Sequence, residues 1–141
     1  EDVLVYKVHN LVPEKVLEQR YRQINDFERY LSENNIVVVK FFLHISKEEQ
    51  RARLQARLDT PDKRWKFHVG DLAEPQLWND DQKAYQAAPA KCADSAPWYI
   101  IPADRKWYRD WAVASILKET LKKINPSFPE AEEGLDGLKV E

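Results

Sequence analysis

Residues 13–34 show the first clear hydrophobic pattern in the chain, and the pattern is helical. Apolar and aromatic positions recur there every three or four residues, as one buried face of an α-helix requires. Pro13 suits the first turn, and Asn34-Asn35 should end the helix. Residues 3–12 are ambiguous, because their β-branched side chains favour a strand while the spacing of their leucines and valines also fits a helix.

Residues 36–45 (IVVVKFFLHI) carry the strongest strand pattern. One alternating face is wholly apolar and the other is largely so, which is typical of a central parallel strand covered by helices on both sides. The sequence SKEE follows directly and predicts a capping box, with Ser46 at the N-cap and Glu49 at the third helical position. A helix should then run to about Leu58, so strand and helix form a β–α unit.

Residues 59–97 are the least regular part of the chain. Pro61 breaks the preceding helix, another helix should begin at Glu74-Pro75, and Pro89 should stop it. The segment KRWKFH from Lys63 has the composition of an exposed basic and aromatic hexapeptide.

A second strand and a last helix complete the pattern. Residues 98–101 (WYII) predict a short strand between two prolines, and Asp104 can cap a helix over residues 106–124. This helix carries an apolar stripe formed by Trp107, Trp111, Ala114, Leu117, Leu121 and Ile124.

This order of elements predicts an α/β fold with a parallel sheet and flanking helices. Residues 1–125 should form one domain, in which residues 59–97 are an insertion, followed by an acidic tail over residues 126–141. Two certain strands make a sheet that is too small to stand well alone, so we expect further strands of the same sheet outside this sequence.

The amino-acid composition excludes several kinds of functional site. Gly70 is the only glycine before Gly134, so neither a G-x-x-x-x-G-K-[ST] phosphate loop nor a G-x-G-x-x-G dinucleotide turn can be written. One cysteine excludes a disulfide framework and a multi-cysteine zinc site, and it suits a cytoplasmic protein. No apolar run approaches the roughly 20 residues of a membrane span, so we expect no membrane partner.

The helix after Ser46 carries the most suggestive charges. Leu54 and Leu58 form a seam that should dock on the sheet, with Arg53 and Arg57 on one flank. The ordinary interpretation is a solvated surface with pairs such as Glu49–Arg53, in which case Arg53→Ala would change little.

Two features favour phosphate binding instead. The helix leaves the carboxyl end of a strand, where α/β sheets bind their ligands. It also leads into Lys63, Arg64 and Lys66. The segment from Lys47 to His68 therefore contains seven Lys or Arg and only four Asp or Glu. Guanidinium forks capture phosphate oxygens in pairs, and together these cations could neutralise a polyanion.

Other polar and aromatic residues have ordinary explanations that compete with functional ones. We expect Trp65 to anchor its segment to Leu72 and Trp78 rather than to stack on a base. Asp71 should cap the next helix, with Mg²⁺ binding as the alternative. Lys106, like Arg105, follows the second strand and could bind phosphate or pair with Asp104 and Asp110. We expect His44 on a sheet face and Cys92 in a polar connection.

Several uncommon strings occur in one order along the chain. They are FFLHISKEEQRARLQARL from Phe41, DTPDKRWK from Asp59, Gly70-Asp71, and APWYIIPADRKWYR from Ala96. In these strings the chain closely resembles the polyphosphate kinase 2 family, over roughly residues 1–125. The resemblance implies a P-loop kinase fold like that of thymidylate kinase. It also implies that EDVLVYKVH follows a Walker B-type motif, which would make residues 3–12 helical.

The activity implied is transfer of phosphate between inorganic polyphosphate and a nucleoside mono- or diphosphate, with Mg²⁺. By resemblance, Arg57 is the catalytic lid arginine at the phosphoryl group, and Lys63, Arg64 and Lys66 belong to a mobile lid over about residues 59–97. Asp71 matches an acidic lid position and is the candidate metal ligand, and Arg53 and Lys106 are candidate phosphate ligands.

The resemblance also defines what this sequence lacks. The Walker A and Walker B motifs, with the main Mg²⁺ ligands, are expected ahead of Glu1, so residues 1–141 alone should not turn over. The implied partners are polyphosphate and adenine nucleotides (AMP or ADP), with guanine nucleotides as a further option, and the implied assembly is a homo-oligomer.

Two alternatives stay open. One is the lid half of another P-loop nucleotide kinase, which a comparison of polyphosphate and ATP as donors would separate. The other is a non-enzymatic module that binds nucleic acid or another polyanion. The net charge of -2 argues against the second, because nucleic-acid binders usually carry a basic excess over the whole domain.

Overall fold

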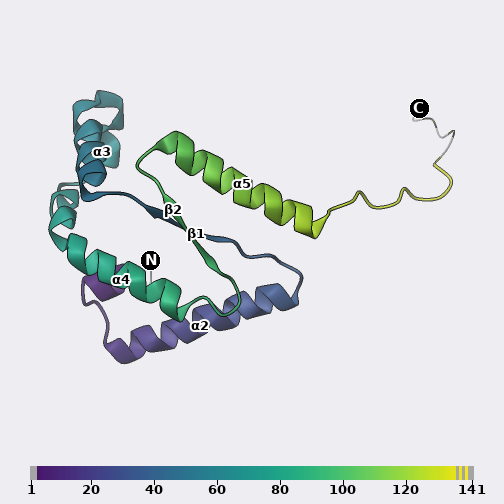
Figure 1. The fold of residues 1–141 in the computed structure, drawn as a ribbon, viewed down its shortest axis with the longest axis horizontal. Helices are drawn as coiled ribbons and strands as arrows, with labels where there is room; N and C mark the ends of the chain where they lie inside the picture. Colours follow the sequence, from purple (N-terminus) through teal and green to yellow (C-terminus); the bar gives the residue numbers. More distant parts are fainter. Residues whose placement is uncertain (1–2, 136, 138, 140–141) are drawn as a thin grey trace.

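The computed structural model describes residues 3–135, 137 and 139 (Figure 1). The elements, in chain order, are α1 (Leu4–Val8), α2 (Glu14–Glu33), β1 (Lys40–His44), α3 (Lys47–Asp59), the 3₁₀ helices η1 (Pro61–Lys66), η2 (Val69–Leu72) and η3 (Glu74–Leu77), α4 (Trp78–Lys91), β2 (Trp98–Pro102) and α5 (Lys106–Ile124). No helix within the described residues is both long and apolar enough to cross a membrane.

β1 and β2 form a two-stranded parallel sheet, which confirms the predicted α/β class. The register pairs Lys40 with Trp98 at one end and His44 with Pro102 at the other. In Figure 1, α5 lies on one side of the strands and α2 and α4 lie on the other. The carboxyl ends of both strands therefore meet at one edge of the sheet.

The prediction for residues 36–45 was too long, and its two covered faces are wrong. Only Lys40–His44 form a strand, because β2 offers five residues to pair with. Ile36, Val37 and Leu43 are exposed. The apolar character of this segment is genuine, but in the described residues part of it has no covering element.

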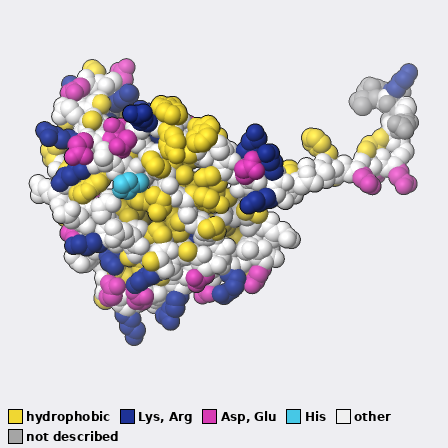
Figure 2. Space-filling model, viewed as in Figure 1, with side chains coloured by type: hydrophobic (Ala, Val, Ile, Leu, Met, Phe, Trp, Pro, Cys, Tyr) yellow, Lys and Arg dark blue, Asp and Glu magenta, His cyan; other side chains and the backbone are white. Residues whose placement is uncertain are grey.

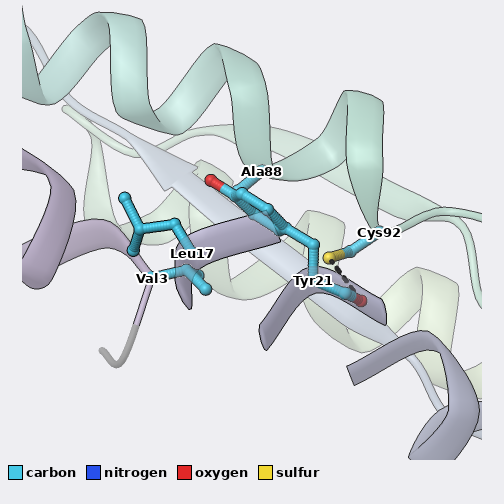
Figure 3. Packing of buried hydrophobic residues seen from close by; sticks show 5 residues of the cluster. All are labelled: Val3, Leu17, Tyr21, Ala88 and Cys92. Atoms are coloured by element: carbon cyan, nitrogen blue, oxygen red, sulfur yellow. Dashed lines mark hydrogen bonds between the residues drawn. The ribbon is translucent and has the colours of Figure 1, made fainter. Parts of the chain in front are cut away.

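The best-packed cluster lies between α1, α2 and α4 (Figure 3). Val3 precedes α1, Leu17 and Tyr21 come from α2, and Ala88 and Cys92 come from the end of α4. Cys92 begins the connection after α4, as predicted, but its side chain is buried in this apolar cluster and not in polar surroundings. Its thiol is buried and lies 3.8 Å from the carbonyl oxygen of Tyr21, and burial raises the pKa of that thiol.

A buried ion pair joins this cluster to the sheet. The ammonium of Lys40 lies 2.6 Å from a carboxylate oxygen of Glu28 and also donates to the carbonyl of Cys92. The indole N–H of Trp98 donates to the same carbonyl at 2.7 Å. These contacts connect α2, β1, the end of α4 and β2 through groups that must be satisfied once they leave water.

Other local predictions have mixed outcomes. The helix that the family resemblance implied over residues 3–12 is confirmed in part, since residues 4–8 are helical and residues 9–12 are not. Pro89 does not stop its helix: α4 continues to Lys91, and the N–H of Cys92 still bonds to the carbonyl of Ala88. Trp65 and Leu72 are exposed, so the expected anchoring of Trp65 is wrong.

Helix starts also differ in part from expectation. The helix expected from Glu74 begins as η3 and becomes α-helical only at Trp78. α5 has Arg105 at its N-cap and no side-chain cap, so the predicted Asp104 cap is wrong. The carboxylate of Asp104 is used elsewhere, at the start of α3.

Candidate functional site

A cavity of about 420 Å³ lies at the carboxyl ends of the two strands. Its walls come from the end of β1, the loop after β2 and the first turn of α5, and include His44, Ser46, Asp104, Arg105, Trp107 and Tyr108. The carboxyl edge of a parallel sheet is where α/β folds place their ligands, since the loops there are free to carry polar groups. This cavity is therefore the candidate functional site.

A network of hydrogen bonds clamps the loop after β2 to the start of α3. The backbone N–H of Ser46 donates to a carboxylate oxygen of Asp104 at 2.7 Å, and the Ser46 hydroxyl accepts from the N–H of Glu49 at 3.1 Å. This backbone hydrogen bond is the main reason why the pKa of the Asp104 carboxyl lies below its ordinary value. The predicted capping box is therefore confirmed in part. The Ser46 hydroxyl caps α3, but the backbone N–H of Ser46 donates to the carboxylate of Asp104 and not to that of Glu49.

Arg53 completes the clamp from the middle of α3. Its Nε donates to Glu49 at 2.7 Å, and its Nη2 donates to the carbonyls of Ala103 at 2.7 Å and Asp104 at 3.3 Å. The predicted Glu49–Arg53 pair is confirmed, but the side chain of Arg53 is only 29% exposed, so the solvated-surface interpretation fails for this residue. Arg53 holds one wall of the cavity in place.

Arg57 lies further along α3, away from the clamp. It is exposed, and among the described residues it has no hydrogen-bond or ion-pair partner. At 1.5 Å per residue, Arg57 stands about 16 Å from Ser46 along the helix axis. Arg57 therefore lies well away from the cavity whose wall Arg53 holds through the carbonyls of Ala103 and Asp104.

The basic segment after α3 folds back on the end of that helix. α3 packs chiefly against η1 and η3, not against the sheet as its leucine seam suggested. Within η1, Arg64 donates to the carbonyl of Leu58 at 2.7 Å, and the ammonium of Lys66 lies 4.9 Å from the centre of the Trp65 ring. Lys63 is exposed on the same short helix.

The comparisons with known proteins agree on one family. The Polyphosphate kinase 2 (PPK2) family model matches residues 1–129. This chain belongs to the polyphosphate kinase 2 family. It is 51% identical over 142 residues to an AMP/ADP-polyphosphate phosphotransferase of Meiothermus ruber, covering all of this chain and 53% of that protein. It is 38% identical to an ADP-polyphosphate phosphotransferase of Rhodopseudomonas palustris, covering 92% of this chain and 50% of that one.

The fold agrees with the family as well. A crystal structure of polyphosphate kinase 2 from Arthrobacter aurescens matches 95% of this chain with a TM-score of 0.88 and 44% identity. The match covers 48% of that chain. This PPK2 chain therefore spans about half the length of the relatives it matches.

Asp71 does not assemble a metal site with its neighbours in this PPK2 chain. One of its carboxylate oxygens accepts from the N–H of His68 at 3.1 Å, at the start of η2, so it supports that turn from the third position and does not cap a later helix. Within the described residues, no three His, Cys, Asp or Glu side chains come close enough to hold a metal ion. Mg²⁺ takes six oxygen ligands, and the carboxylate of Asp71 alone could supply only one or two of them. A magnesium role for Asp71 therefore stays a prediction.

The cavity also contains residues that the sequence interpretation did not select. His44 lies on the sheet as expected, at the last position of β1, but it is exposed and lines the cavity. Tyr108 was assigned only to the last helix, although it lies in the first turn of α5, shortly after the end of β2. The rule that ligands bind at strand carboxyl ends, applied to each strand end in turn, would have found both. Lys106 begins α5, whereas Asp110 pairs with Arg109 and not with Arg105 or Lys106.

Proposed function

We propose that the whole protein containing this chain transfers phosphate between inorganic polyphosphate and AMP or ADP. The observation that carries the proposal is the cavity at the joined carboxyl ends of β1 and β2, in a chain that belongs to the polyphosphate kinase 2 family. The names of the Meiothermus and Rhodopseudomonas relatives support these substrates.

In this proposal β1 and β2 are the last strands of a P-loop kinase-type sheet. The glycine-rich phosphate loop and the Mg²⁺ ligands belong to the other half of the fold, and Mg²⁺ would neutralise phosphate charge there. The present chain supplies cations to a reaction in which positioning and charge stabilisation do most of the work. Cytoplasmic location and homo-oligomeric assembly are part of the same proposal.

The cations divide into two groups. Arg53 acts as a positioning residue, because its donors already bind Glu49 and the carbonyls of the loop after β2. Arg57, Lys63 and Lys66 form the mobile group, and they are exposed and available for phosphate. Arg57 lies about 16 Å along the helix from the start of α3, so the end of α3 and η1 must move toward the cavity when polyphosphate binds.

A chimera tests this function. Residues 1–141 would replace the matching half of the Meiothermus ruber relative, and ATP and ADP formation would be measured with polyphosphate as donor. Arg57→Ala should lower kcat by roughly 100-fold or more, because one preorganised charge at a phosphoryl group contributes on that scale. Arg51→Ala is the matched control, since it is an exposed arginine on the same helix, and it should stay within about twofold.

The outcomes separate the alternatives. Near-normal turnover of the Arg57→Ala chimera would show that the assigned role is wrong. A chimera that uses ATP but not polyphosphate would indicate another nucleotide kinase. Turnover by residues 1–141 alone would contradict the proposed division of the fold into two halves.

A further inference from the structure

Trp65, on η1, is the most exposed tryptophan of the chain, with 75% of its surface in water. The ammonium of Lys66 lies 4.9 Å from the centre of its ring, and among the described residues no other ring packs against it. Trp98 shows the usual alternative, since it is partly buried and its indole N–H donates to a carbonyl at 2.7 Å. Exposure of one apolar side chain is ordinary by itself, but two features of η1 make that of Trp65 informative.

The first feature is that the turn carrying Trp65 is well fixed. η1 begins at Pro61, whose ring restricts the backbone, and it ends where the N–H of Phe67 donates to the carbonyl of Arg64 at 3.0 Å. The guanidinium of Arg64 donates to the carbonyl of Leu58 at 2.7 Å, which ties η1 to the end of α3. The indole is thus presented by a defined turn, so a planar group that binds it loses little affinity to ordering of the backbone.

The second feature is the charged surface around η1. Lys63 and Lys66 stand on either side of Trp65 in the sequence, and both are exposed. Figure 2 shows Lys and Arg side chains mixed with acidic ones over α3 and the segment after it, whereas the largest hydrophobic area lies over the strands and the beginning of α5. A protein interface would surround its aromatic residues with a continuous apolar area. A lone indole between cations fits a small ligand that has both a flat ring and negative charge.

We propose that Trp65 stacks on the base of the nucleotide substrate. The base would lie on the face of the indole opposite the Lys66 ammonium, and the ammonium groups of Lys63 and Lys66 would meet the phosphates. This role rests on the proposed function, and it assigns Trp65 to one of the two substrates. Inorganic polyphosphate has no aromatic ring, and its anionic oxygens are repelled by the electron-rich face of an indole. Every base has a π-face, so Trp65 should bind AMP and GMP about equally.

The test measures nucleotide binding without a phosphate donor, in the chimera of residues 1–141 with the Meiothermus ruber relative. Trp65→Ala removes the ring, Trp65→Leu replaces it with an aliphatic side chain, and Trp65→Phe keeps an aromatic face. Val69→Ala is the control, because Val69 is 82% exposed on the next 3₁₀ helix and has no ring. Equilibrium dialysis gives Kd for AMP, ADP and GMP, and tripolyphosphate, which has no base, reports on the cations alone.

Trp65→Ala and Trp65→Leu should weaken the binding of all three nucleotides by about 10-fold or more, which is the loss expected when one stacked base loses its partner. Trp65→Phe should stay within about threefold of the native chimera, because phenylalanine keeps an aromatic face. Val69→Ala should change no Kd by more than about twofold, and the Kd of tripolyphosphate should stay within about twofold in every variant. Since Trp65 is exposed, Tm should shift by less than about 2 °C, and circular dichroism checks the fold.

An unchanged Kd for AMP in Trp65→Ala would overturn the proposal, and so would a Trp65→Phe chimera that binds as weakly as Trp65→Ala. Equal losses for AMP and tripolyphosphate would also overturn it, because Trp65 would then only hold the lysines in place. If Trp65→Ala fails to fold, the comparison of Trp65→Leu with Trp65→Phe gives the same decision.

The same measurements separate this role from the proposed function. A native chimera that binds no nucleotide would contradict both. If AMP binding depends on Trp65 but polyphosphate does not serve as donor, the stacking role stands and only the proposed donor is wrong. If polyphosphate serves as donor and AMP binding does not depend on Trp65, the proposed function stands and the stacking role is wrong.

Discussion

Replacing Arg53 with alanine should remove the clamp between α3 and the loop after β2. The guanidinium makes one hydrogen bond of 2.7 Å to the carbonyl of Ala103 and a longer one to Asp104. Hydrogen bonds from a charged group to a satisfied acceptor contribute about 1.5–3 kcal/mol each. The ion pair with Glu49 adds only a few tenths of a kcal/mol, because it joins neighbouring turns of one partly exposed helix.

Both carbonyls are bound by the same Nη2 of Arg53, so they count together as one hydrogen bond, and since the side chain keeps some contact with water its contribution lies in the lower part of this range. We expect Arg53→Ala to lower the free energy of unfolding by about 2 kcal/mol. With a denaturant slope of about 2 kcal/mol per molar urea for a chain of this size, the unfolding midpoint should fall by about 1 M. Tryptophan fluorescence and circular dichroism during urea titration of residues 1–141 would measure it.

Arg57→Ala is the internal control. It removes the same side chain from the same helix, but Arg57 is exposed and has no partner among the described residues, so the change should stay within about 0.5 kcal/mol. Arg53→Lys should fall between the two, because lysine keeps the charge but loses the planar fork. Equal midpoints for Arg53→Ala and Arg57→Ala would refute the clamp and restore the solvated-surface interpretation.

Two further predictions concern the remaining polar contacts. The N–H of Ser46 lowers the pKa of Asp104 below its ordinary 3.8, so the stabilising contribution is present above that value and is lost as the pH falls through the folded pKa. The urea midpoint of the native chain should therefore fall more steeply than that of Asp104→Asn between about pH 5 and pH 2, and parallel curves would contradict this. Glu28→Ala leaves the buried ammonium of Lys40 without its carboxylate and should destabilise by about 3–5 kcal/mol, or abolish cooperative unfolding. The double variant Glu28→Ala with Lys40→Met should recover most of that loss in the same urea titration, and a loss below about 1 kcal/mol in the single variant would count against the ion pair.

The periodicity of the sequence was enough to predict most helices. The face of α2 that includes Leu17 and Tyr21 is buried as expected, because a helical stripe needs only one apolar neighbour to be satisfied. The 36–45 strand was overestimated for a related reason: β propensity describes a residue that fits a sheet, but a strand exists only where another strand supplies hydrogen bonds. Of the candidate site, the sequence located the carboxyl end of the strand and the arginines beyond it. It did not predict that His44 lines the cavity, nor the role of Asp104.

The amino-acid sequence by itself determined the α/β class, the helix limits near Ser46 and Ile124, and the family, because these depend on local spacing and on uncommon strings. Only the tertiary structure decided which partner each polar group takes. Ser46 receives its second capping contact from Asp104, which is 58 residues away, and Arg53 bonds to a loop 50 residues away. Local pattern offers no sign of either contact, since a donor pairs with whichever acceptor the chain brings within 3 Å. The structure likewise shows that most of the apolar stripe of α5 is exposed among the described residues, which the spacing of its apolar positions did not reveal.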